Sequence, residues 1–193
     1  GLFDPGTIMF KAYNSAAVRH PGKSLSEMIT ALSALPLAFH PGTQWEYSVA
    51  TDVLGRLVEV VSGESFGKFL SRRIFEPLGM TDTDFWVPEA KLKRLCAMYV
   101  GEDLLDPTKP GLHRADDKPF PGAYTKKLPL ESGGGGLVST LGDTVKFIQS
   151  FLPGGPALLK ADTIDLMYRN QLASDLCVRF PNKPASTSKG FGL

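Results

Sequence analysis

Apolar residues recur along this chain mainly with the period of an α-helix. The residues at positions 50, 53, 54, 57, 58 and 61 are apolar, which places them on one helix face, and Gly63 follows where helices commonly end. Ser24 and Glu27 have the spacing of a capping box, so a second helix is expected from Ser24 until Pro36 stops it. The pattern therefore predicts two well-formed helices in the first part of the chain.

Three further helices are predicted in the rest of the sequence. Ser65 can cap a helix that stops at the EPLGM stretch at 76–80. Thr140 can cap another helix, which ends at the PGGP stretch at 153–156. The last helix is expected over residues 163–168. The chain is thus predicted to be mostly helix and loop.

Long irregular segments separate these helices. Residues 1–23, 81–131 and 180–190 carry turn residues or charge with weak periodicity, so we expect loops there, with two short strands within 81–131, for example around residues 96–100. A structureless stretch of about 50 residues is uncommon in a compact helical bundle. We therefore interpret the chain as part of a larger domain.

Composition narrows the classes of partner. The chain has 193 residues, 42% of them hydrophobic and 21% charged, with a net charge of +1, so neither nucleic acid nor an anionic membrane is expected as a partner. No run of 18 apolar residues predicts a membrane span, and no signal peptide is visible, which slightly favours the cytoplasm over the periplasm. The two cysteines, Cys96 and Cys177, are expected to be free thiols.

Most short motifs of catalysis or ligand binding do not occur. The sequence has no C-x-x-C or H-x-x-x-H motif, so we expect neither a metal site nor a cofactor site. The glycine-rich stretch SGGGGL at 132–137 lacks a phosphate-binding pattern. Its glycines indicate a close approach of the backbone either to another backbone segment or to a ligand.

The spacing S-x-x-K, which marks some serine acyl-transfer enzymes, occurs twice. The serines are Ser65, paired with Lys68, and Ser186, paired with Lys189. With fourteen serines and thirteen lysines, about one such spacing is expected by chance. Ser65 is explained by helix capping and Ser186 lies in a polar stretch, so neither is a strong candidate nucleophile.

One long segment resembles a known family. The stretch FHPGTQWEYSVATDVLGRLVEVVSGESFGKFLSRRIFEPLGMTDTDF at 39–85 is similar to the serine β-lactamase-like, or penicillin-binding-protein-like, superfamily. SGGGGLVSTLGDTVKF at 132–147 and the terminal GFGL resemble later landmarks of it. The resemblance is strongest to family VIII carboxylesterases, which share the class C β-lactamase fold. It implies an α+β, β-lactamase/DD-peptidase-like fold.

The resemblance also implies that residues 1–193 form a single partial domain. The family orders three motifs, S-x-x-K, Y-x-N or a variant, and a Lys-Thr-Gly-like strand, and only the second is matched here, by Tyr47-Ser48-Val49. The first motif is then expected upstream of Gly1 and the third downstream of Leu193. The chain would be mainly the helix-rich lobe with its long loops, without the nucleophile segment and the C-terminal sheet.

By the same resemblance, Tyr47 is the residue that moves the proton of the nucleophilic serine. The alternative from the residues alone is that Tyr47 packs at a helix N-terminus. Val49 stands where class C β-lactamases generally carry an asparagine that can hydrogen-bond an acylamide substrate, and family VIII esterases more often have an apolar or small residue there. Val49 is thus a candidate substrate contact in an esterase, with simple helix packing as the alternative.

These features predict a serine hydrolase that cleaves carboxylic esters through an acyl-serine intermediate, without metal or cofactor. The expected substrate is a small-molecule ester, with a β-lactam as a second class, and the expected partner of this chain is the remainder of the same enzyme. A β-lactamase or D-alanyl carboxypeptidase of the same fold is one alternative. A non-catalytic binding module is the other, and the chain alone is expected to be inactive because it lacks a credible nucleophile.

Overall fold

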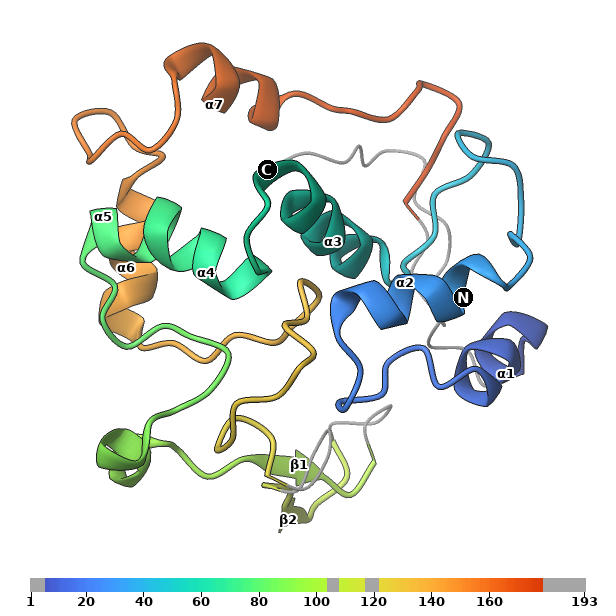
Figure 1. The fold of residues 1–193 in the computed structure, drawn as a ribbon, viewed down its shortest axis with the longest axis horizontal. Coiled ribbons are helices and arrows are strands. Elements are labelled where there is room, and N and C mark those ends of the chain that lie inside the picture. The colour runs from blue at the N-terminus through green and yellow to red at the C-terminus, as the bar shows by residue number, and fades with distance from the viewer. Residues whose placement is uncertain (1–5, 104–107, 117–121, 179–193) are drawn as a thin grey trace.

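The computed structural model describes residues 6–103, 108–116 and 122–178 as helices linked by long loops, with one small sheet (Figure 1). The α-helices are α1 (Ile8–Ser15), α2 (Leu25–Ser33), α3 (Ala50–Ser62), α4 (Phe66–Leu70), α5 (Glu76–Leu78), α6 (Leu141–Gln149) and α7 (Ala161–Tyr168). A π-helix, η1 (Ser71–Phe75), links α4 to α5, and a 3₁₀ helix, η2 (Glu89–Arg94), precedes the strands. Strands β1 (Tyr99–Gly101) and β2 (Leu112–Arg114) pair antiparallel. Helix α3 lies near the centre, in contact with α2 and α4.

The predicted helix ends are confirmed in detail. The Ser24 hydroxyl accepts a hydrogen bond from the Glu27 amide at 3.3 Å, and the Glu27 carboxylate accepts from the Ser24 amide at 2.8 Å, which completes the capping box of α2. Helix α3 ends at Gly63, whose φ of 72° is left-handed. The Thr140 hydroxyl accepts from the Asp143 amide at the start of α6. Local side-chain chemistry therefore sets these boundaries.

The helix predicted from Ser65 to the EPLGM stretch is present but irregular. Ser65 caps it as expected, and it ends at Gly79 with a φ of 64°. Between these ends, η1 widens the helix just before Pro77. Proline has no amide hydrogen and its ring crowds the carbonyl group four residues earlier, which explains the change from α to π geometry.

The expectation of a loop over residues 1–23 is wrong in part, because α1 lies within it. Thr7 caps this helix by accepting a hydrogen bond from the Phe10 amide at 3.2 Å. A threonine cap without an acidic residue three positions later is a weak sequence signal, and α1 was missed for that reason. Within 81–131, the short sheet near residues 96–100 is confirmed, whereas η2 was not predicted. Residues 180–190 lie outside the described part of the chain.

The buried apolar residues form two small cores. The first joins α2 to the start of α3 and consists of Val18, Leu25, Met28 and Val49. The second consists of Phe75, Leu78 and Met80, at the end of the irregular helix. Cys96 and Cys177 are free thiols, as expected. Within the described residues, no helix combines the length and apolar content that a membrane crossing requires.

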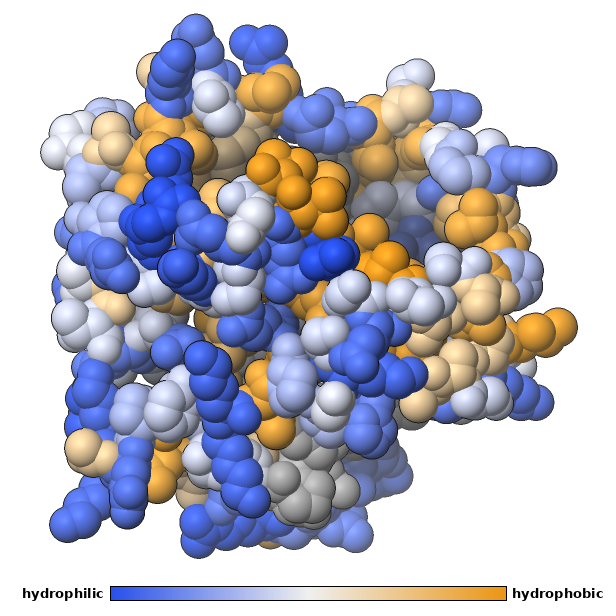
Figure 2. Space-filling model, in the orientation of Figure 1, coloured by the Kyte–Doolittle hydropathy of each residue, from blue (hydrophilic) through white to orange (hydrophobic). Residues whose placement is uncertain are grey.

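The apolar face of α3 is turned toward solvent. Leu57 is 54% exposed and Val61 is 80% exposed, whereas the polar Asp52, on the opposite side of the helix, is buried. Figure 2 shows apolar side chains gathered over the position of α3, near the centre of the view. An amphipathic helix normally buries its apolar stripe, so the orientation of α3 is inverted with respect to the described part of the chain.

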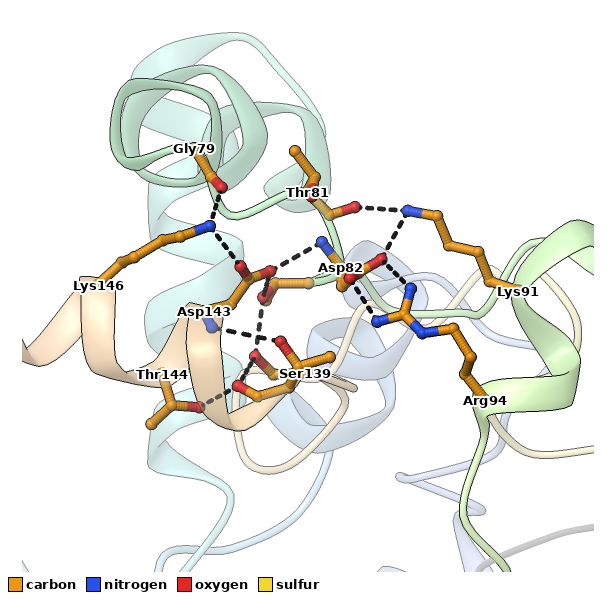
Figure 3. Close-up of polar contacts among 11 residues, drawn as sticks. Gly79, Thr81, Asp82, Lys91, Arg94, Ser139, Asp143, Thr144 and Lys146 are labelled. Carbon is orange, nitrogen blue, oxygen red and sulfur yellow. Dashed lines mark hydrogen bonds and ion pairs between the residues drawn. The ribbon is translucent and has the colours of Figure 1, made fainter.

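A junction centred on Asp143 fastens α6 to the loop that follows α5 (Figure 3). The Asp143 carboxylate, which is 3% exposed, accepts hydrogen bonds from the Asp82 amide at 2.8 Å and the Thr83 hydroxyl at 3.0 Å. It also pairs with the Lys146 ammonium at 3.0 Å. Burial raises the pKa of Asp143, but Lys146 and the two hydrogen-bond donors outweigh this effect, so the pKa lies below its ordinary value.

The Asp82 side chain extends this junction to η2. Its carboxylate receives two hydrogen bonds from the Arg94 guanidinium, at 3.0 and 2.6 Å, and pairs with Lys91 at 2.8 Å. The hydrogen bonds from Arg94 and Lys91 hold the pKa of Asp82 far below its usual range. Lys91 also donates to the Thr81 carbonyl at 2.7 Å. Three elements separated in sequence are thus held by one ionic cluster.

The Asp143 junction predicts that the chain loses stability in acid. Because the pKa of Asp143 is lower in the folded chain than the value near ~3.9 of a free aspartate, its stabilising contribution is present above about pH 4 and lost below it. Asp143→Asn should lower the unfolding free energy at pH 7 by about 1–3 kcal/mol and flatten its fall between about pH 5 and 3. Urea unfolding at several pH values measures both effects.

The control variant is Asp162→Asn, which removes an exposed carboxylate from the first turn of α7. Its unfolding free energy should retain the acid sensitivity of the original chain. Equal pH profiles for the two variants would contradict the role assigned to Asp143.

Candidate functional site

Tyr47 lies three residues before the first residue of α3 and lines a cavity. Its side chain is 41% exposed, so the phenol ring is accessible. The cavity has a volume of about 200 Å³ and is walled by residues of α1, by the segment 37–41 and by Glu46, Tyr47 and Ser48. The residue that the sequence singled out for proton transfer is therefore placed at a hollow in the surface. Its catalytic role stays a prediction.

Val49 is placed differently from Tyr47, although only one residue separates them. It occupies the N-cap position of α3, is 3% exposed, and packs with Val18, Leu25 and Met28 in the first core. Val49 does not line the cavity beside Tyr47. This position favours the helix-packing interpretation, and a contact between Val49 and a substrate stays a prediction.

Asp52, which the sequence analysis did not single out, fixes the N-terminal turn of α3. Its carboxylate is 2% exposed and accepts a hydrogen bond from the Ser132 hydroxyl at 2.5 Å. The Gly134 amide donates to the same oxygen at 3.4 Å. An acidic side chain in the first turn is also favoured by the helix dipole. Asp52 thereby joins the helix that begins beside Tyr47 to a segment 80 residues away.

The glycine-rich stretch packs against this same turn. A Cβ on Gly133 would lie 2.4 Å from the Thr51 carbonyl oxygen, and one on Gly134 would lie 3.0 Å from the Asp52 carboxylate. One on Gly136 would lie 2.7 Å from the Ser132 carbonyl oxygen. Of the two interpretations left open by the sequence, the structure therefore supports a close approach of backbone to backbone.

Neither S-x-x-K spacing forms a reactive pair in the described residues. The Ser65 hydroxyl accepts a hydrogen bond from the Lys68 amide at 3.3 Å as the cap of α4, and both side chains are exposed. This geometry confirms the capping interpretation of Ser65. Ser186 and Lys189 lie outside the described residues.

A second cavity, of about 290 Å³, adjoins the Asp143 junction. Its walls include Trp86, Leu95 and Cys96, together with the paired charges of Asp82, Lys91 and Arg94. Because Lys91 and Arg94 both pair with the Asp82 carboxylate, these side chains serve the fold rather than present a free acid or base. Across the described residues, no group of three or more His, Cys, Asp or Glu side chains is arranged to hold a metal ion. The cavity at Tyr47 is therefore the better candidate site.

The packing of the glycines predicts opposite effects for two Gly→Ala substitutions. Gly133→Ala should destabilise the chain by about 1–3 kcal/mol, because its Cβ would collide with the backbone of Thr51. Gly142→Ala in α6 should instead stabilise it by about 0.5–1 kcal/mol, since the nearest atom to its Cβ is 4.0 Å away and alanine favours the helix. Chemical denaturation measures both values. Equal effects of the two substitutions would argue against the close approach of the glycine-rich stretch to α3.

Comparison with known proteins places these features in a family. The chain is 33% identical over 174 residues to a lovastatin esterase from Penicillium rubens. The aligned residues make up 90% of this chain and 41% of the esterase. It is 28% identical over 155 residues to the esterase EstB from Burkholderia gladioli, covering 76% of this chain and 39% of that enzyme. The chain thus spans less than half the length of these curated relatives.

Solved structures share the fold. EstCE1, described as a hydrolase with promiscuous acyltransferase activity, matches with a TM-score of 0.70 over 84% of this chain and 45% of that one, at 22% identity. A penicillin-binding protein homologue from Pyrococcus abyssi matches with a TM-score of 0.60 over 94% of this chain and 38% of its own, at 20% identity. The expected β-lactamase/DD-peptidase-like fold is therefore confirmed. The Beta-lactamase family model matches residues 2–193, and the chain belongs to this family.

Proposed function

We propose that this chain is the helix-rich part of a serine hydrolase that cleaves carboxylic esters through an acyl-serine intermediate, with Tyr47 as its proton-transfer residue. The observation that carries the proposal is the position of Tyr47, in a Tyr-Ser-Val sequence at the N-terminus of α3 and on the wall of a cavity. This is the place and residue type that the second motif of the family requires.

The relatives support hydrolysis of an ester. Two of them are named as esterases, and another, from Aspergillus terreus, is named as a monacolin J acid methylbutanoyltransferase and is 31% identical over 142 residues. A short acyl ester is therefore the favoured substrate class. A β-lactam or D-amino-acid amide is the second candidate, since a D-stereospecific amidohydrolase from Streptomyces shares the fold at a TM-score of 0.57. The apolar Val49 offers no side-chain amide for such a substrate.

The proposed chemistry needs a cation close to the phenol. An unperturbed tyrosine has a pKa near ~10 and is a poor base at neutral pH, and an adjacent ammonium group lowers this value. In the family, lysines of the first and third motifs supply that charge. Tyr47 would then accept the proton of the serine hydroxyl during attack on the ester carbonyl and return it to the departing alkoxide. Water attacks the acyl-serine in the second half of the reaction.

The exposed face of α3 supports the proposal that the remainder of the same enzyme packs on it. This chain covers 41% of the length of the lovastatin esterase, and most of the apolar stripe of α3 is uncovered by the described residues. Leu54 and Val60 add to the stripe, at 57% and 62% exposed. Helix α3 begins at Ala50, directly after the Tyr47-Ser48-Val49 motif, so a segment seated on this face would also pass close to Tyr47.

Replacement of Tyr47 by phenylalanine in the full-length enzyme tests the catalytic role. The ring and its packing are kept, but the hydroxyl that moves the proton is lost. We expect kcat for 4-nitrophenyl butanoate to fall about 10²–10⁴-fold. The melting temperature should change little, because one hydrogen bond contributes only about 0.5–1.5 kcal/mol net. An active but unstable Tyr47→Phe enzyme would show that Tyr47 is structural.

Ser65→Ala is the matched control, since it removes a hydroxyl that only caps α4. Its kcat should equal that of the original enzyme, while the cap loss lowers stability by about 1 kcal/mol. The 193-residue chain alone should hydrolyse no nitrophenyl ester above background. A full-length enzyme with no turnover on esters, β-lactams or D-amino-acid amides would favour a non-catalytic binding module.

Lysines placed on the exposed apolar face of α3 should improve the solution behaviour of the 193-residue chain alone but destabilise the full-length enzyme. Leu57→Lys with Val61→Lys should reduce hydrophobic-dye binding and self-association of the chain alone, because an exposed apolar patch invites association. In the full-length enzyme the same pair should lower the melting temperature, because the lysines would be buried without partners. Ala90→Lys, at an exposed position outside α3, is the control and should do neither. A full-length enzyme that tolerates both lysines would exclude packing on this face.

A further inference from the structure

The cavity beside Tyr47 has apolar walls and one carboxylate. Met9 and Tyr13 of α1 form one wall, and the segment 37–41 forms another with two aliphatic side chains, a phenylalanine and a proline. The third wall is Glu46–Ser48, which carries the only acidic side chain of the described lining. A hollow of this composition favours an uncharged apolar group over an ion.

Glu46 acts on this cavity electrostatically. Burial raises the pKa of the Tyr13 hydroxyl, and the negative charge of Glu46 raises it further, which places the carboxylate within electrostatic reach of the α1 wall. The Glu46 carboxylate therefore makes a negative contribution to the electrostatic potential of the cavity next to Tyr47. An anionic ligand would be repelled from it, whereas a neutral or cationic one would not.

The size of the cavity limits its ligand. Its volume of about 200 Å³ lies below the roughly 300–1,000 Å³ of pockets that enclose drug-sized molecules. It suits a short chain of a few carbon atoms rather than a bulky polycyclic group. Ala38, an exposed and small residue of the segment 37–41, lies on this wall, so a larger side chain there would reduce the space directly.

We propose that this cavity is a specificity subsite of the ester hydrolase: it takes a short, uncharged apolar group of the substrate, and Glu46 excludes substrates that carry a negative charge on that group. This inference rests on the proposed function. The apolar group can belong either to the acyl part or to the alcohol part of the ester, because a short hydrocarbon chain of either part would make the same apolar contacts with the cavity walls.

Charge selection is tested with Glu46→Gln in the full-length enzyme. The ratio of kcat/KM for 4-nitrophenyl hydrogen succinate to kcat/KM for 4-nitrophenyl butanoate should rise about three- to tenfold at low salt, since a repulsive charge is removed. The original enzyme should show a similar gain as ionic strength rises, because salt screens the same repulsion. Glu89→Gln, which removes an exposed carboxylate from η2, should leave the ratio unchanged.

Size selection is tested with Ala38→Phe against Ala90→Phe, an exposed alanine in η2 that does not line the cavity. Ala38→Phe should lower kcat/KM for the longest member of one ester series about tenfold or more relative to the shortest, which is the scale of such discrimination. Nitrophenyl acetate, butanoate and hexanoate vary the acyl group, and methyl, propyl and butyl acetate vary the alcohol. The series that responds identifies which group occupies the cavity.

The outcomes separate this inference from the proposed function. An original enzyme that hydrolyses neither series overturns the function itself. If it hydrolyses esters, but neither Glu46→Gln nor Ala38→Phe changes a ratio more than its control does, the enzyme is an esterase and the subsite is refuted. A change of the succinate ratio in Glu46→Gln, together with a length effect in Ala38→Phe, supports the subsite.

Discussion

The hydrogen bond between the buried Asp52 carboxylate and Ser132 is the interaction on which the arrangement around Tyr47 depends. A carboxylate that is 2% exposed is costly to bury unless its oxygens have donors, and the hydroxyl of Ser132 and the amide of Gly134 supply them. Those donors belong to a glycine-rich stretch, which can approach the Asp52 carboxylate only because Gly133 has no Cβ. The start of α3, and with it the tyrosine, is thereby fixed to a distant part of the chain.

This arrangement has a consequence for the other side of α3. When the polar side of the helix turns inward to satisfy Asp52, the stripe around Leu57 and Val61 must turn outward. The described residues bury only two small apolar clusters, and they leave this stripe uncovered. A chain that covers 41% of a homologous esterase is expected to have such a surface where the remainder of the fold would pack.

Local features of the fold were predictable from the sequence, and long-range ones were not. The caps at Ser24, Ser65 and Thr140 and the end at Gly63 depend on residues within one turn, so their spacing revealed them. Helix α1 was missed because its threonine cap is not followed by an acidic residue three positions later. The pairing of Asp52 with Ser132 joins residues 80 apart, and no local pattern marks such a partner. The glycine-rich stretch at 132–137 indicated a close approach of its backbone, but not whether to a ligand or to another backbone segment.

In the candidate site, too, local sequence could be read but three-dimensional placement could not, so the resemblance to a family was needed to single out Tyr47. Only Ser48 separates Tyr47 from Val49 in the motif, yet the first side chain lines a cavity and the second packs in the core. The sequence could name the pair but could not tell which side chain faces a substrate. The proton-transfer role of Tyr47 needs a cation, which the proposed nucleophile segment would bring. If that segment seats on α3, the contact that buries the apolar stripe also delivers the charge, so folding of the two parts and assembly of the catalytic group would be one event.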